Sequence, residues 1–157
     1  MSLPRDSTVL PAADAAPLPG KDLLGDLLWE VTTYVELLGE AELADTSLTL
    51  PSSGMLQTVL AVPGITVAEM SRRMPKTQQA ISQVAARLEK LGLLERRVGS
   101  GRGVGLFVTD EGRRAAEQGA AREREVEQRL HEALGDKRYE QLRRLLGESR
   151  AIFRELR

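Results

Sequence analysis

The sequence predicts a mainly α-helical protein with one small β-hairpin (α+β). Apolar residues recur at spacings of three and four over most of the 157 residues, which is the period of amphipathic helices. Aromatic residues make up only 3% of the chain, so the core must consist mostly of Leu, Val and Ala, which suits helices better than a sheet sandwich. Two short apolar or alternating runs, 93–98 and 104–108, flank a glycine-rich segment, and this pattern indicates the hairpin.

The chain begins with a proline-rich segment that is followed by a long helix. Residues 1–20 hold four prolines and show no sustained periodicity, so we expect a flexible tail. From Lys21 onward a broad apolar stripe predicts a helix in the segment 21–45. A stripe of this breadth is too wide for one neighbour to cover, so the helix should pack against several elements or against a second subunit.

The middle of the chain starts with two shorter helices. The run from Pro51 to Ser53 indicates the start of the first, and Pro63-Gly64 indicates its end. Thr66 is followed three residues later by Glu69, which is the spacing of a capping box and opens the second. That short helix should bury Val67 and Met70.

Pro75 then breaks the short helix, and a further helix follows. Thr77 is its expected N-cap and Gly92 its C-terminal stop. Its apolar face consists of Ile81, Val84, Ala85, Leu88 and Leu91. Two helices around a proline turn, followed by a two-stranded hairpin, are the order of a winged helix-turn-helix.

The glycine-rich segment between the two runs also raises the alternative of a phosphate-binding loop. The segment "GSGRGVG" lacks the glycine offsets of a dinucleotide fingerprint, and no Gly-Lys-Ser/Thr follows it. Phosphate loops of both kinds lead from a strand into a helix, whereas this segment leads from strand to strand. We therefore interpret it as the tip of a hairpin.

Two helices complete the chain. Thr109 is the expected cap of a long charged helix, with Asp110 and Glu111 placed where the positive end of the helix dipole favours acids. Gly135 and Asp136 turn the chain into the last helix. Its apolar stripe consists of Leu142, Leu145, Leu146, Ile152, Phe153 and Leu156.

Charge is unevenly distributed along this chain of net charge −1. Residues 1–65 carry 2 Lys or Arg against 9 Asp or Glu, whereas residues 66–114 carry 10 against 5. A basic middle third favours a localised anionic partner such as nucleic acid, although chance segregation of surface charge would give the same pattern.

The helix that begins at Thr77 has the composition of a DNA-reading helix. At about 100° per residue, Gln79 and Gln83 point away from the core position Ile81. A Gln amide can contact both N6 and N7 of adenine in the major groove. The alternative is a merely solvated polar face. Lys76, Thr77, Gln78 and Ser82 lie around these two glutamines on the same exposed side or at the helix start.

Three segments in order resemble the MarR (multiple antibiotic resistance regulator) family of dimeric winged-helix transcription factors. They are Pro63-Gly64-x-Thr66-x-x-Glu69-Met70, Leu88-Glu89-Lys90-Leu91-Gly92-Leu93-x-Glu95-Arg96 and Thr109-x-x-Gly112. The resemblance implies a homodimer whose first and last helices form the interface, a recognition helix at about 77–90, and a wing whose arginine enters the minor groove.

One position departs from that family pattern. The family wing carries Asp-x-Arg, and the corresponding positions here hold Ser100 and Arg102. Because the acid that braces the wing is missing and glycines surround Arg102, we expect a looser wing.

The resemblance and the residues together define a set of expected roles. We expect a sequence-specific repressor, released by a small-molecule effector, that binds double-stranded DNA at a pseudo-palindromic operator. Its winged-helix lobe would span 47–113, with dimerisation helices at 21–45 and 114–157 in a single domain 21–157. The expected DNA contacts are Arg72, Arg73, Lys76, Thr77, Gln78, Gln79, Ser82, Gln83, Arg97 and Arg102. The expected dimer contacts are Leu24, Leu28, Val31, Leu145, Ile152 and Phe153.

The family also implies an effector, expected here to be a small aromatic or phenolic compound. Trp29, Tyr34 and Met55 are the candidate ligand contacts, although interface packing is the favoured alternative for Trp29. The chain has no cysteine and a single histidine, His131, which excludes a thiol sensor and makes a multi-histidine metal site impossible.

The remaining function classes are disfavoured. No catalytic set can be assembled around one histidine, so we expect no enzyme, no cofactor and no metal. The chain has neither a signal peptide nor an apolar run long enough to span a bilayer, which predicts a cytoplasmic protein without a membrane partner. The alternative left open is a winged-helix protein-interaction module that no longer reads DNA.

Overall fold

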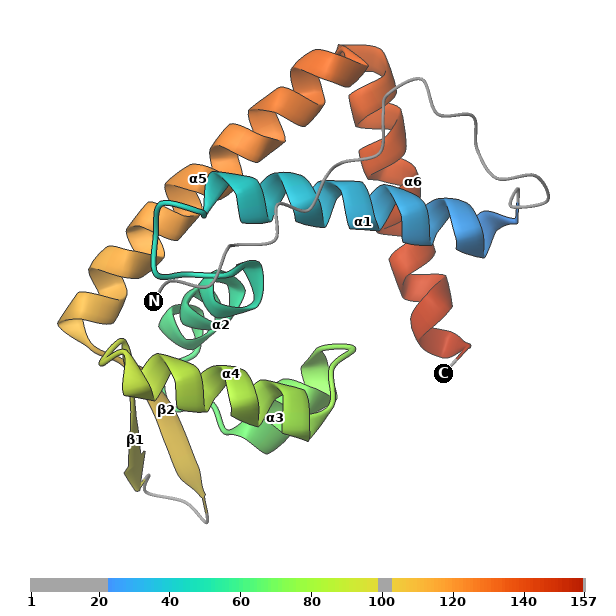
Figure 1. Ribbon diagram of the computed structural model, residues 1–157. Helices are drawn as coiled ribbons and strands as arrows, with labels where there is room; N and C mark the ends of the chain where they lie inside the picture. Colours follow the sequence, from blue (N-terminus) through green and yellow to red (C-terminus); the bar gives the residue numbers. More distant parts are fainter. Residues whose placement is uncertain (1–22, 99–102, 157) are drawn as a thin grey trace, which may run out of the picture.

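The computed structural model describes residues 23–98 and 103–156 (Figure 1). The elements are α1 (Leu24–Glu42), α2 (Leu50–Ala61), α3 (Val67–Arg73), α4 (Gln78–Lys90), β1 (Leu94–Val98), β2 (Val104–Val108), α5 (Asp110–Leu134) and α6 (Asp136–Glu155). The expected class, mainly helical with one antiparallel hairpin, is confirmed.

The elements separate into a compact lobe and a frame of long helices (Figure 1). Helices α2, α3 and α4 and the hairpin form the lobe. Helix α5 leads away from the hairpin, α1 packs against it, and α6 turns back from its far end. Within the described residues, every helix is too short or too polar to span a bilayer.

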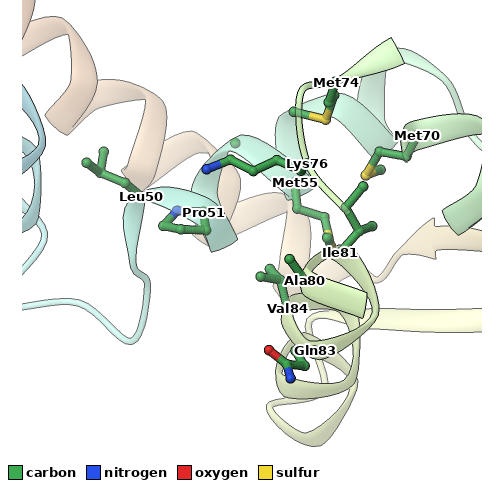
Figure 2. A pocket seen from close by; sticks show the side chains of 11 residues that line it. Leu50, Pro51, Met55, Met70, Met74, Lys76, Ala80, Ile81, Gln83 and Val84 are labelled. Atoms are coloured by element: carbon green, nitrogen blue, oxygen red, sulfur yellow. The ribbon is translucent and has the colours of Figure 1, made fainter. Parts of the chain in front are cut away.

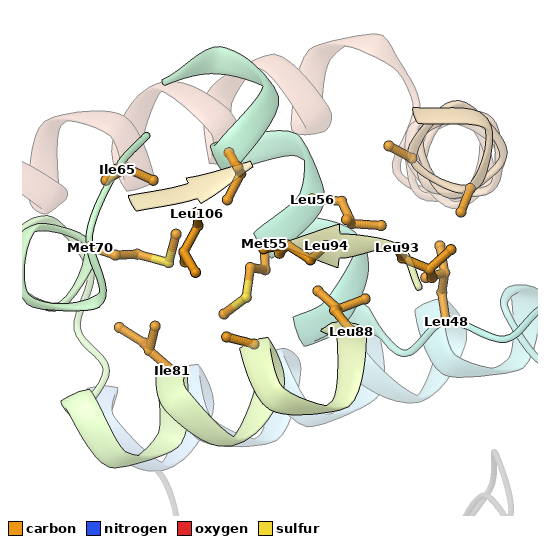
Figure 3. Packing of buried hydrophobic residues seen from close by; sticks show 14 of the residues in the cluster. Leu48, Met55, Leu56, Ile65, Met70, Ile81, Leu88, Leu93, Leu94 and Leu106 are labelled. Atoms are coloured by element: carbon orange, nitrogen blue, oxygen red, sulfur yellow. The ribbon is translucent and has the colours of Figure 1, made fainter. Parts of the chain in front are cut away.

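The hydrophobic core lies inside the lobe (Figure 3). Leu56 and Val59 of α2 pack with Leu88 of α4 and with Leu106 of β2, and all four side chains are fully buried. Leu91 is an exception to the expected apolar face of α4, because it is the C-cap residue and remains 43% exposed. Once the last helical turn has ended, the helical period no longer determines which side of the element a residue occupies.

Threonine side chains cap the N-termini of four of the described helices. The capping box of α3 is confirmed: the Thr66 hydroxyl accepts from the Glu69 N–H at 3.1 Å, and the Glu69 carboxylate accepts from the Thr66 N–H at 2.8 Å. Thr77 caps α4 as expected. Helix α2 begins earlier than expected, because Thr49 is its N-cap and accepts from the N–H of Ser52.

The capping box predicts a pH dependence of stability. Hydrogen bonds from Thr66, first its backbone N–H and then its hydroxyl, lower the pKa of Glu69. A lowered folded-state pKa stabilises the protein above the ordinary value of 4.5 and loses that effect as the pH falls through the folded pKa. Glu69→Gln should therefore be less stable than wild type near neutral pH, and the difference should shrink in acid. Thermal unfolding between about pH 3 and 7 measures this. Glu117→Gln, which removes an exposed carboxylate from α5, should show no such convergence.

The hairpin is attached to the turn that precedes α3. Strand β1 pairs with β2 in the register Glu95↔Phe107 and Arg97↔Gly105. On its other side β2 pairs with that turn, since the Gly64 N–H donates to the Leu106 carbonyl at 2.9 Å and the Leu106 N–H donates to the Ile65 carbonyl at 3.0 Å. A Cβ on Gly105 would lie 2.7 Å from the Gly64 carbonyl oxygen, so this approach requires glycine. The hairpin base is therefore fixed to the helix-turn-helix.

The start of α5 is packed against the end of α4. The Thr109 hydroxyl accepts from the Gly112 N–H at 3.0 Å and donates to the Gly92 carbonyl at 2.7 Å. A Cβ on Gly112 would lie 1.9 Å from the carbonyl oxygen of Leu93, which no side chain can occupy. The pair Thr109 and Gly112 therefore joins the frame to the lobe.

A second junction connects α5 with α2. The fully buried Ser53 hydroxyl donates to the Glu123 carboxylate at 2.7 Å, and the Gln57 amide donates to the same carboxylate at 3.0 Å. Gly119 lets the two helices approach, because a Cβ there would lie 2.4 Å from the Ser53 hydroxyl oxygen. Two contacts of α5 thus set the orientation of the lobe on the frame.

The single histidine, His131, packs at the corner between α5 and α6. The His131 ring stacks on Tyr139 with the ring centroids 4.3 Å apart, and its Nε2 lies 2.9 Å from an Asp136 carboxylate oxygen. Tyr139 also donates a hydrogen bond to Glu127, and this bond raises the pKa of the Tyr139 phenol. These contacts hold the corner between α5 and α6.

Candidate DNA-binding surface and pocket

The amino-terminal half of α4 forms an exposed polar surface. The Thr77 hydroxyl accepts from the Ala80 N–H at 3.2 Å and fixes the first turn of the helix. On the inner side Ile81 is buried in the core, while Gln79 and Gln83 are exposed on the outer side, as the helical period predicts. Lys76, Thr77 and Gln78 are exposed at the helix start, and Ser82 is half-buried.

Two arginines lie beside this helix start. Arg72 and Arg73 are exposed in the last turn of α3, which leads through Pro75 to α4. Both lie within four positions of Lys76 in the sequence, so three exposed basic residues surround the turn between α3 and α4.

Arg97 lies on the hairpin and is held by two neighbours. Its guanidinium pairs with the Glu95 carboxylate and lies 5.0 Å from the centroid of the Phe107 ring. The Phe107 ring lies close to Gly64 in the turn before α3. Arg97 is thus oriented by the base of the wing. Ser100 and Arg102, where the family pattern places the wing acid and arginine, lie outside the described residues.

The adjacent Arg96 points to the other face of the hairpin. Its Nε donates to the Glu89 carboxylate at 2.9 Å, which links β1 to the last turns of α4. Arg96 and Glu89, which both belong to the segment Leu88–Arg96 of the family pattern, therefore have a structural role. The two neighbouring arginines differ: Arg96 joins β1 to α4, whereas Arg97 faces solvent beside Phe107.

A pocket of about 340 Å³ lies between α2, α3 and the start of α4 (Figure 2). Its lining is almost entirely apolar, with Lys76 and Gln83 as the polar residues. The lining residues are Leu50, Pro51, Gly54, Met55, Met70, Met74, Lys76, Ala80, Ile81, Gln83 and Val84. Two of the side chains expected to contact DNA therefore also contribute to a pocket.

The pocket includes one of the three expected ligand contacts. Met55 lines it, whereas Trp29 and Tyr34 lie on the exposed side of α1 and are not among its lining residues. Sequence reasoning missed Met70 and Met74 as lining residues. The residue type was the available signal in the sequence, because every methionine of the chain other than Met1 lines this pocket.

Comparison with known proteins identifies the group to which the chain belongs. The model of the MarR family matches residues 46–103. The HTH-type transcriptional repressor Rv2887 of Mycobacterium tuberculosis is 32% identical over 136 residues, which cover 85% of this chain and 94% of that protein. The chain belongs to the MarR family.

Solved structures of that MarR-family relative agree with this assignment. The complex of Rv2887 with salicylic acid has a TM-score of 0.65 and 30% identity, and the match covers 87% of this chain and 98% of the relative. The complex of Rv2887 with DNA has a TM-score of 0.66 and 28% identity, and covers 80% and 96% of the two chains. The match therefore includes both the lobe and most of the frame.

The MarR motif segments have structural explanations in this chain. Gly64 adopts a positive φ of 81° and pairs with β2, and Thr66 with Glu69 caps α3. Thr109 and Gly112 join α5 to the end of α4. These residues of the MarR pattern therefore build the winged helix.

Proposed function

We propose that this protein is a homodimeric, sequence-specific DNA-binding repressor that a small-molecule effector releases from its operator. The observation that carries the proposal is the exposed surface of α4, where Gln79 and Gln83 stand opposite the buried Ile81 beside a basic helix start. Glutamine amides on a rigid helix are suited to base edges in the major groove. The named relative is a transcriptional repressor, with structures bound to DNA and to salicylic acid.

The proposed contacts either position the protein on the DNA backbone or read the bases. Arg72, Arg73, Lys76 and Arg97 would neutralise backbone phosphates, while Arg102 would enter the minor groove. The reading contacts would come from Thr77, Gln78, Gln79, Ser82 and Gln83. Glu95 and Phe107 would hold the Arg97 guanidinium at the wing base in a defined direction.

The proposed dimer covers apolar surface that the single chain leaves exposed. Helix α6 has no buried residue, and Leu145, Ile152 and Phe153 are 46%, 58% and 46% exposed. An amphipathic helix that leaves its apolar stripe exposed is stabilised by a partner. Leu24 and Val31 of α1 are exposed as well, while Leu28 is half-buried. We assign 21–45 and 114–157 to dimerisation and 47–113 to DNA reading.

This assignment needs no catalytic group. Of the described residues, no cluster of three His, Asp or Glu side chains could hold a metal ion. A regulator of this kind acts where chromosomal DNA is, so the proposal assigns the protein to the cytoplasm and gives it no enzymatic role.

The reading role of α4 is tested by substitution of Gln79. Selection of bound DNA from a random pool should yield a pseudo-palindrome with half-sites about one helical turn apart. Gln79→Ala should then lose about 1–3 kcal/mol of discrimination at one base pair per half-site while non-specific binding stays unchanged. Quantitative gel shifts with the selected site and point variants of it, repeated at several salt concentrations, measure both quantities. Gln118→Ala, on the exposed side of α5, is the matched control and should bind like wild type.

The same experiment distinguishes the alternative function. A winged helix that binds acidic proteins instead would show DNA affinity that falls steeply with salt but no selected sequence. That outcome, or a Gln79→Ala variant with unchanged base preference, would contradict the proposed reading role.

A further inference from the structure

A single carboxylate interrupts the small-residue face with which α5 meets the lobe. Helix α5 runs from the hairpin past α2 to its corner with α6 (Figure 1). Its buried residues before Glu123 are Gly112, Ala115, Ala116 and Gly119. Glu123 follows one helical turn after Gly119 and is half-buried. Its carboxylate accepts hydrogen bonds from the fully buried Ser53 hydroxyl at 2.7 Å and from the Gln57 amide at 3.0 Å. We call Ser53, Gln57, Gly119 and Glu123 the α2–α5 junction.

Attraction between opposite charges does not explain the carboxylate at this position. In the described part of the chain Glu123 forms no ion pair, whereas the adjacent Arg122 pairs with Asp45 and Glu125. Withdrawing a carboxylate from water costs free energy, and an aliphatic side chain would fill the space between two helices without that cost. A carboxylate held by two donors instead defines a distance and a direction between the helices that carry them. The junction is therefore suited to fixing the angle between α2 and α5.

The junction lies far enough from the start of α5 to act as a lever. At that start Gly112 has no free space against Leu93, since a Cβ there would lie 1.9 Å from the Leu93 carbonyl oxygen. Glu123 lies eleven positions further along, which is about 16 Å at 1.5 Å per residue. A displacement of about 1 Å at Glu123 thus corresponds to a rotation of the lobe by about 4° around the contact at Gly112.

We propose that Ser53, Gln57 and Glu123 are positioning residues, which hold the lobe at one angle on α5 and thereby determine the spacing of operator half-sites that the dimer accepts. They act through α4, which shares the hydrophobic core with α2. The inference rests on the proposed function, because half-site spacing has meaning only for a dimer that reads DNA.

The two-fold symmetry of the proposed dimer amplifies the effect of the junction. A rotation of the lobe moves the recognition helix in each protomer, so the separation of the two helices changes twice. Successive base pairs are only about 3.4 Å apart along the DNA axis. Small rotations of the lobe therefore decide which spacing fits, and a lobe that is free to rotate accepts several.

Selection from DNA pools in which the spacer between half-sites varies in length tests this specificity. Wild type should favour one spacing by at least about 10-fold over sites one base pair longer or shorter. Glu123→Leu removes both acceptor oxygens and should reduce this preference to less than about 3-fold, while the preferred bases within each half-site stay the same. Glu117→Leu makes the same change on the exposed side of α5 and should keep the wild-type preference. Partial unfolding would weaken binding to all spacings equally, so the ratio separates positioning from stability.

Exchange of donor and acceptor gives a second test that adds no apolar surface. Gln57→Glu alone places two carboxylates opposite each other and should lose the spacing preference as Glu123→Leu does. When Glu123→Gln is added, the amide on α5 can donate to the carboxylate on α2, and its oxygen still accepts from the Ser53 hydroxyl. The double variant should therefore recover the spacing preference to within about two-fold of wild type.

A distance measurement without DNA separates this proposal from the proposed function. The chain contains no cysteine, so Ala86→Cys in α4 and Ala133→Cys in α5 provide two unique labelling sites, both exposed. Pulsed electron paramagnetic resonance then measures the distance between two spin labels in one chain, with an excess of unlabelled protein to keep labelled chains apart. The distribution should be narrow in wild type, broad or shifted in Glu123→Leu and Gln57→Glu, and narrow again in the double variant.

The two measurements contradict different steps of the proposal. Equal distance distributions in wild type and Gln57→Glu, with both folded by circular dichroism, would overturn the positioning role. Changed distances with an unchanged spacing preference would overturn the effect on the operator. If no DNA sequence is selected, the proposed function fails, and the distances still decide whether the junction holds the lobe on α5.

Discussion

Gly112→Ala is expected to lower the free energy of unfolding by roughly 3 kcal/mol, since overpacking against rigid neighbours costs about 1–3 kcal/mol or more. The added Cβ would lie 1.9 Å from the carbonyl oxygen of Leu93 and 2.8 Å from Cγ1 of Val108. The first of these neighbours is backbone, so relief requires α5 to shift away from the end of α4. That shift would also weaken the hydrogen bond from the Thr109 hydroxyl to the Gly92 carbonyl.

Urea denaturation of wild type, Gly112→Ala and a control variant measures the loss in the free energy of unfolding. Gly54→Ala is the matched control, because its Cβ meets open space in a helix interior and should stabilise the protein by roughly 0.5–1 kcal/mol. A Gly112→Ala protein as stable as wild type would show that α5 does not need its close approach to Leu93. We also expect Gly112→Ala to weaken DNA binding, because the same junction orients the lobe on the frame.

Ile152→Glu is expected to convert the dimer to a monomer. Ile152 is 58% exposed in the single chain and lies in the apolar stripe of α6 that the proposed dimer covers. A two-fold interface would bury the new carboxylate twice without a partner, and each unpaired buried charge costs several kcal/mol. We expect the dimer dissociation constant to rise at least about 100-fold, which corresponds to roughly 2.7 kcal/mol.

Sedimentation velocity over a concentration series measures the dissociation constant. Arg143→Gln is the control, because position 143 lies about 180° around the helix from position 152. The core of the lobe does not include Ile152, so circular dichroism should show a protein that is still folded. Operator affinity should fall with the dimer, since one recognition helix alone contacts one half-site. A persistent Ile152→Glu dimer would place the interface elsewhere.

Features that depend on neighbours in the sequence could be predicted well. The capping box of Thr66 and Glu69 and the caps Thr77 and Thr109 depend on contacts across three residues, so their spacing is visible in the sequence. The exposed positions of Gln79 and Gln83 follow in the same way from the helical period around Ile81. The exact start of a helix was less predictable: α2 is capped by Thr49, whereas the sequence indicated a start between Pro51 and Ser53.

Features that depend on how elements cross could be found only in the tertiary structure. Gly112 meets Leu93 across 19 positions, and Gly105 meets Gly64 across 41, and nothing in either local sequence specifies the partner. The pocket is the clearest case, because Met55, Met70 and Lys76 come from α2, α3 and the turn before α4.

Most helices, the caps Thr66, Thr77 and Thr109, the hairpin and the polar face of α4 could be predicted because they depend on local contacts along the chain. The need for glycine at positions 105 and 112, and the place of Lys76 in a pocket with three methionines, depend on how the elements pack. A close approach or a cavity is a property of two packed surfaces, and the sequence of each surface alone contains only half of it.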